Sequence, residues 1–207
     1  TGDEAACIQE AGAAEATVPE ALLGVACYAF DSQVSGACQD ELDFGGAPDT
    51  PTERGNFFGT YPPAFYATMS LFVGPDIEAA VLAMRVVAAV IFTLLATALY
   101  LLLPPARRAT LVWSWAVTTV PLGLFVLAST NPSSWAVAGV GLGWLALAAF
   151  FETRGARKFG LAALFAIFVA MAAGSRGDAS LYMILAILAV VVLQVHRTRR
   201  FAVEAIL

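Results

Sequence analysis

The sequence predicts an all-α membrane protein: a bundle of five transmembrane helices preceded by an irregular, disulfide-bonded lobe. Hydrophobic residues make up 59% of the 207 residues and charged residues only 13%, which is typical of polytopic membrane proteins. Apolar runs of membrane-spanning length recur between residues 77 and 195. Residues 1–78 hold thirteen acids and one arginine, so an acidic lobe, residues 1–76, precedes a basic bundle, residues 77–207. Acidity on this scale excludes nucleic acid as a partner of the lobe.

All three cysteines lie in the lobe, where Pro19 is also expected to start a short helix through Leu23, ahead of Cys27. A short, turn-prone segment separates Cys27 from Cys38, and closing that loop contributes roughly 3 kcal/mol in a chain-entropy model. We expect these two to pair in an exported lobe, with a bond from Cys7 to either one as the alternative.

No metal site or cofactor is predicted. The sole histidine, His196, falls on the opposite side of the predicted membrane from the cysteines. The sequence also lacks a Walker loop, a nucleophile elbow and a dinucleotide-binding fingerprint.

A short helix over residues 63–72 is expected between the lobe and the bundle. Pro62 and Pro63 favour a helix start, and Gly74 with Pro75 ends it. Aromatic residues cluster here as they do at membrane interfaces, so the helix is expected to lie at the membrane surface. These residues are Phe57, Phe58, Tyr61, Phe65, Tyr66 and Phe72.

Five membrane spans follow. The first is apolar apart from Glu78, Arg85 and two threonines, and we expect it to organise the chain. The second is broken by Pro121, which removes a helical hydrogen bond. The expected spans are residues 77–103, 111–129, 132–151, 159–173 and 179–195.

The basic residues orient these spans. Eight of the eleven lie in the turns that follow the first, third and fifth spans. The positive-inside rule places these turns in the cytoplasm and the lobe outside, in a multi-pass protein of the cytoplasmic membrane. The chain begins with Thr1, and an odd number of spans with the first end outside suggests that an upstream segment is missing.

An outer-leaflet site for an anionic head group, such as a lipid phosphate, follows from this topology. Asp76, Asn131 and Asp178 are predicted helix N-caps on the outer face, where helix N-termini favour phosphate. Arg85 and Arg176 add positive charge there. The alternative is structural, because every helix start needs a cap and Arg85 would pair with Glu78 or Asp178. The candidate binding residues are Arg85, Arg176, Asp178, Asn131, Tyr61 and Tyr66.

Gly139 and Gly143 form a GxxxG pattern inside the third span. Such a pattern lets two helices approach closely. It is explained either by packing within the bundle, which we favour, or by dimerisation.

Five segments carry a resemblance to a known family: VPEALLGVACYAFDSQVSGAC, GTYPPAFYA, AMRVV, NPSSWAVAG and SRGD. Together they resemble an uncharacterised polytopic membrane family of actinobacteria, a domain of unknown function that is distantly similar to the C-type glycosyltransferases. The resemblance implies transfer of sugar from a polyprenyl phosphate at the outer membrane face, for cell-envelope glycan synthesis. Its catalytic carboxylate would follow a span upstream of this chain, so the catalytic residues stay unknown. The alternative is a non-catalytic membrane subunit that docks through its outer lobe on a larger complex.

The topology makes a first prediction. Cysteines introduced at Ala106 and Ala156, in the basic turns, should resist a membrane-impermeant thiol reagent in intact cells, because these turns are cytoplasmic. Labelling of either residue in intact cells would reverse the orientation.

Overall fold

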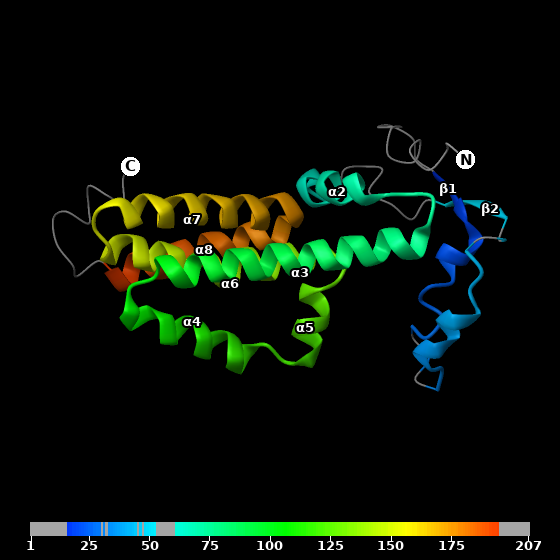
Figure 1. Ribbon diagram of the computed structural model, residues 1–207, viewed down its shortest axis with the longest axis horizontal. Coiled ribbons are helices and arrows are strands. Elements are labelled where there is room, and N and C mark those ends of the chain that lie inside the picture. Colours follow the sequence, from blue (N-terminus) through cyan, green and yellow to red (C-terminus); the bar gives the residue numbers. More distant parts are fainter. Residues whose placement is uncertain are drawn as a thin grey trace. The chain divides into compact units, whose positions relative to one another are not determined.

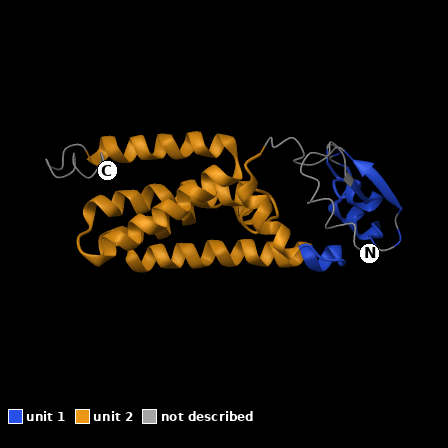
Figure 2. Cartoon of the chain, turned by 90° about the horizontal axis from the view of Figure 1, so that it is seen from above, with its two compact units in different colours: residues 1–60, 73–80 blue, residues 61–72, 81–207 orange. Residues whose placement is uncertain are grey.

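The computed structural model describes residues 16–29, 31, 33–44, 46, 48–52 and 61–194. It divides into two compact units, one of residues 1–60 and 73–80 and the other of residues 61–72 and 81–207 (Figure 2). Cys7 and His196 lie outside the described residues. The expected division of the chain at residue 76 stays a prediction.

The first unit contains a small sheet and two 3₁₀ helices. Strand β1, Ala16–Pro19, pairs antiparallel with β2, Asp49–Thr52. The 3₁₀ helix η1, Glu20–Leu23, follows β1 directly, and η2, Gly36–Glu41, precedes β2. The short helix expected after Pro19 is therefore present, whereas the sheet was not predicted, because four-residue strands that contain proline give no alternating pattern.

Cys27 and Cys38 form a disulfide bond, with their Cα atoms 6.3 Å apart. The expected pairing is confirmed. The separation falls in the ordinary range for disulfides, so the bond closes the turn-rich segment between η1 and the end of η2.

The second unit is helical (Figure 1). The expected short helix is present as α2, Pro63–Met69, extended by the 3₁₀ turn η3, Ser70–Phe72. The helices of the bundle are α3, Ile77–Leu102, whose first turn belongs to the first unit; α4, Pro105–Thr118; α5, Pro121–Leu127; α6, Ser133–Glu152; α7, Ala156–Ser175; and α8, Gly177–Gln194.

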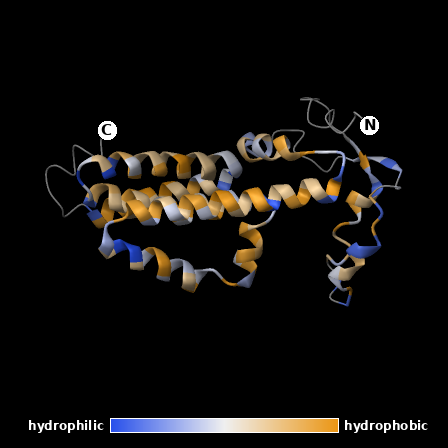
Figure 3. Ribbon diagram, viewed as in Figure 1, coloured by the Kyte–Doolittle hydropathy of each residue, from blue (hydrophilic) through white to orange (hydrophobic). Residues whose placement is uncertain are grey.

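Four of these helices are long and apolar enough to cross a membrane, and the bent pair α4–α5 brings the number to five if it is one span. Apolar residues cover α3, α6, α7 and α8 along most of their length (Figure 3). The predicted fold class, a mostly helical multi-pass membrane protein with a disulfide in its N-terminal region, is confirmed.

Helix α6 is the centre of the bundle. It packs against α4, α5, α7 and α8. In its apolar stretch 56% of the residues are buried, compared with 11% in the apolar stretch of α3. The expected role of the first span, as the boundary between lobe and bundle, stays a prediction, but the packing centre of the bundle is α6 rather than that span. The reason is side-chain size, because α6 is rich in glycine and alanine and admits neighbours on several sides.

The GxxxG pattern lies inside the bundle. A Cβ atom added at Gly139 would lie 2.7 Å from the Phe168 carbonyl oxygen and 2.9 Å from the Ala172 nitrogen, so the α7 backbone fills that space. At Gly143 the same atom would lie 2.9 Å from the Met183 Cε atom of α8. Packing within the bundle, rather than dimerisation, explains both glycines.

Helices α4 and α5 differ most from the expected second span, residues 111–129. The first helix begins earlier, at Pro105, where a proline suits the first turn. The chain then bends by 107° across Thr119 and Val120, ahead of Pro121, which has no N–H to continue the helix. We call residues 105–127 the α4–α5 arch.

The arch is held at both ends. Near its start, the Arg107 guanidinium donates to both carboxylate oxygens of Glu152, at the end of α6, over 2.6 and 2.9 Å. After its end, the Ala128 carbonyl accepts from the Arg85 Nε of α3 over 3.1 Å, and Ser133 begins α6 five residues later. The arch therefore runs from one end of α6 to the other and counts as one crossing.

Close packing at Gly139 makes a prediction. Gly139→Ala should lower the melting temperature of the purified chain, because a Cβ that meets backbone atoms forces α6 and α7 apart at a cost of about 1–3 kcal/mol. Gly177→Ala is the matched control, since a Cβ there meets no atom within 4 Å. An unchanged or raised melting temperature for Gly139→Ala would show that the contact is loose.

Candidate functional site

The turn between α7 and α8 places Arg176 at one end of the bundle. Helix α7 ends at Ser175, Arg176 is extended at φ −149° and ψ 142°, and α8 begins at Gly177. The Arg176 N–H donates to the Ala172 carbonyl over 3.4 Å, which closes the last turn of α7. A single residue thus links α7 to α8, and its side chain reaches toward the start of α6.

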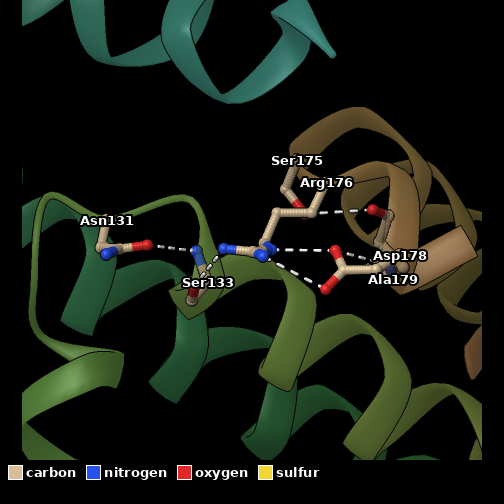
Figure 4. Close-up of polar contacts among 7 residues, drawn as sticks. Asn131, Ser133, Ser175, Arg176, Asp178 and Ala179 are labelled. Carbon is tan, nitrogen blue, oxygen red and sulfur yellow. Dashed lines mark hydrogen bonds and ion pairs between the residues drawn. The ribbon is translucent and has the colours of Figure 1, made fainter. Parts of the chain in front are cut away.

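The Arg176 guanidinium joins α8 to α6 (Figure 4). Its Nε and Nη2 atoms donate to the two Asp178 carboxylate oxygens over 2.9 and 3.2 Å, and its Nη1 donates to the Ser133 hydroxyl over 3.2 Å. The hydrogen bond to Asp178 raises the pKa of Arg176, so this residue stays charged at every physiological pH. Asp178 lies one residue inside α8 and is not the N-cap that the sequence predicted.

Asn131 stabilises the turn that positions Ser133 at the start of α6. Its side-chain oxygen accepts from the Ser133 N–H over 2.8 Å, and its carbonyl accepts from the Ser134 N–H over 2.9 Å. The helix begins at Ser133, two residues after the predicted cap, with Pro132 between them. Asn131 therefore fixes the start of α6, and with it the Ser133 hydroxyl that Arg176 contacts.

Aromatic residues of α2 and of the segment before it complete the site. The Tyr61 ring lies 6.0 Å from the Arg176 guanidinium carbon and 6.4 Å from the Tyr66 ring. Phe65 packs edge-on against Tyr66 and against Trp135 of α6, with centroid distances of 5.7 and 5.5 Å. Burial, and then the proximity of Tyr61, raise the pKa of Tyr66.

A glycine brings α2 to this end of the bundle. A Cβ atom added at Gly174 would lie 2.6 Å from the Ala64 Cβ, so the last turn of α7 accepts α2 only because the residue there is glycine. The structure therefore gathers five of the six candidate binding residues. These are Tyr61, Tyr66, Asn131, Arg176 and Asp178, and with Ser133 we call them the Arg176 site.

A family model matches residues 4–207, almost the whole chain. The chain belongs to the DUF2142 family of predicted membrane proteins. Neither a curated protein nor a solved structure matches it. The family description establishes a membrane protein and assigns no reaction, so the site must be interpreted from its own chemistry.

Arg85, the sixth candidate, has a different partner in this DUF2142 chain. Its Nε donates to the Ala128 carbonyl, and among the described residues it forms no ion pair with Glu78 or Asp178. A charge exposed to hydrocarbon costs at least about 2.5–3.5 kcal/mol, and a carbonyl beyond the end of α5 partly offsets this cost. Arg85 thus fastens the arch rather than joining the Arg176 site.

A second polar cluster, at the opposite end of α6, was not singled out from the sequence. Glu152 accepts two hydrogen bonds from Arg107 and one from the Gln194 amide of α8, the last over 3.2 Å. Gln194 is only 5% exposed. The sequence did offer one signal for this cluster: Glu152 is a single acid at the end of an apolar span, next to a basic turn. The cluster ties α4, α6 and α8 together.

Metal binding finds no support in the part of the chain that the structure describes. No group of three or more histidine, cysteine, aspartate or glutamate side chains is placed there to hold an ion.

The Arg85 contact makes a prediction. Arg85→Ala should lower the melting temperature by removing the hydrogen bond to Ala128, which is worth about 1–3 kcal/mol for a charged donor. Val86→Ala, at the exposed next position of α3, is the control. A variant that melts like the native chain would show that Arg85 does not hold the arch.

Proposed function

We propose that this chain belongs to a glycosyltransferase-like protein that binds a polyprenyl-phosphate-linked sugar at the outer face of the cytoplasmic membrane. The acceptor would be a glycan of the cell envelope, in an actinobacterium if the resemblance noted from the sequence holds. The catalytic carboxylate would lie outside this chain.

The observation that carries the proposal is that Arg176 uses only some of its guanidinium N–H groups in hydrogen bonds to described residues. A guanidinium has five N–H groups, and Asp178 and Ser133 take three of them. Among the described residues no acceptor takes the other two. Phosphate and sugar oxygens are suitable acceptors for a guanidinium fork, and the partly exposed Tyr61 ring offers an apolar face beside it.

Supporting features lie in the surroundings of Arg176. The N-termini of α6 and α8 flank it and carry partial positive charge, which offsets part of the Asp178 charge. Sugar transfer from a lipid phosphate needs no nucleotide, which agrees with the lack of a nucleotide-binding motif in the sequence.

The second candidate is a non-catalytic membrane subunit that docks through its outer lobe on a larger membrane complex. One observation favours it. The charge of Arg176 is already balanced by Asp178, and the guanidinium links α6 to α8 through the Ser133 hydroxyl. In that case the Arg176 site is a structural latch, and a membrane-protein partner would bind elsewhere.

Binding of polyprenyl phosphate to the full chain in nanodiscs separates the two candidates. Arg176→Gln should weaken binding roughly tenfold or more, because a charge-assisted hydrogen bond is lost. Arg157→Gln, exposed at the other end of the bundle, should bind like the native chain.

Asp178→Asn sharpens the test. It removes the balancing negative charge and should leave binding unchanged or tighter if Arg176 meets a phosphate. If the site is a latch, Arg176→Gln and Asp178→Asn should both lower the melting temperature, and neither should affect any lipid binding. That pattern would overturn the proposed function.

A further inference from the structure

The α4–α5 arch encloses a cavity against α6. Its volume is about 350 Å³. The arch is fastened at its ends by Arg107 and Arg85 and bends sharply between them, and near its middle Trp115 packs against Gly141 of α6 beside the cavity. The cavity is lined by Ser114, Trp115, Thr118, Thr119, Gly123, Leu127, Val137, Gly141 and Trp144.

The α6 wall of the cavity lies within a membrane span. Val137, Gly141 and Trp144 follow one another at intervals of four and three residues, which places them along one face of the helix. Val137 on α6 and Thr118 on α4 are exposed, so the cavity opens to the outside at membrane depth. An apolar molecule in the membrane can therefore reach the cavity from the side of the bundle.

The lining favours an apolar occupant. The Thr118 hydroxyl donates to the Ser114 carbonyl over 2.6 Å, and the Ser114 hydroxyl donates to the Leu111 carbonyl over 3.0 Å. Both donors are used within α4, so these side chains expose mainly their carbon atoms. A polar ligand needs several convergent hydrogen-bonding groups, whereas the rest of this lining is mostly carbon, with only the Thr119 hydroxyl and two indole N–H groups as polar side-chain atoms.

We propose that this cavity binds a single hydrocarbon chain of a membrane lipid, inserted sideways from the bilayer between the arch and α6. The shape suits one chain, since the walls are one bent segment and one helix face. The proposal does not depend on the proposed function, because a phospholipid acyl chain and a polyprenyl chain both supply the required chemistry.

Photo-crosslinking tests the proposal on the full chain in nanodiscs. Two probes carry a diazirine in the hydrocarbon region: a phosphatidylcholine with the group in mid-acyl chain, and an uncharged polyprenol with the group near its chain end. Mass spectrometry then locates the labelled residues. The expected result is labelling of cavity-lining peptides, residues 114–119 and 137–144, by at least one probe.

Cavity-filling variants provide the decisive comparison. Gly123→Phe should abolish labelling of the cavity, since a Cβ there meets only the Thr119 Cγ2 at 3.6 Å and the ring has the cavity to fill. Leu124→Phe is the control, because the neighbouring side chain is 62% exposed and points elsewhere. Val137→Trp, at the opening, replaces Gly123→Phe if that variant does not fold, and it should have the same effect.

The two probes separate the sources of the chain. Cavity labelling by polyprenol above phosphatidylcholine would support the proposal and link the cavity to the lipid of the proposed function. Cavity labelling by phosphatidylcholine alone would support the proposal and leave the proposed function to the Arg176 experiment. Labels confined to exposed residues outside these two peptides, such as Leu122 and Phe125, or cavity labelling that survives both filling variants, would overturn it.

Discussion

The contact between Gly139 and the α7 backbone sets the arrangement of the rest of the bundle. A side chain at Gly139 would occupy the space of the Phe168 carbonyl, so α6 and α7 approach each other only with glycine there. In a membrane, helices gain little from hiding apolar surface, and close van der Waals packing is what holds them together. The position of α7 then fixes Arg176 at its end, where the guanidinium reaches Ser133 at the start of α6.

Three arginine side chains form hydrogen bonds that join helices of the bundle. Arg107 and Arg85 hold the two ends of the arch, and Arg176 joins α6 to α8. Arg107 and Arg176 lie at or next to helix ends, with a carboxylate within reach, and Arg85 lies about two turns inside α3 but contacts a carbonyl just beyond the end of α5. The bundle has few charged residues, and these three hold the two ends of the arch and the turn before α8. Between its two fastened ends the arch leaves a cavity against α6.

Most of the fold follows from the sequence. The hydrocarbon interior of a membrane requires continuous apolar helices, and the length of each apolar run identifies a span. The bend before Pro121 was recognised, but not its angle, which depends on what Arg85 and Arg107 contact. Tyr61, Asn131 and Arg176 were grouped correctly because each adjoins a helix start on the same predicted side. The partner of Arg85 and the Glu152–Gln194 contact could not be deduced, since both join residues more than forty positions apart in the sequence.

The α4–α5 arch can form one span because Arg107 fastens its start to the end of α6, while Arg85 of α3 holds the carbonyl just after its end. A double-mutant cycle on Arg107 and Glu152 tests it most directly, with melting temperatures measured for Arg107→Glu, Glu152→Arg and the charge-swapped pair. Each single variant should destabilise the chain by placing like charges together, and the swapped pair should recover much of the loss. If the two effects simply add, Arg107 and Glu152 are not in contact, and the arch is not anchored to the end of α6.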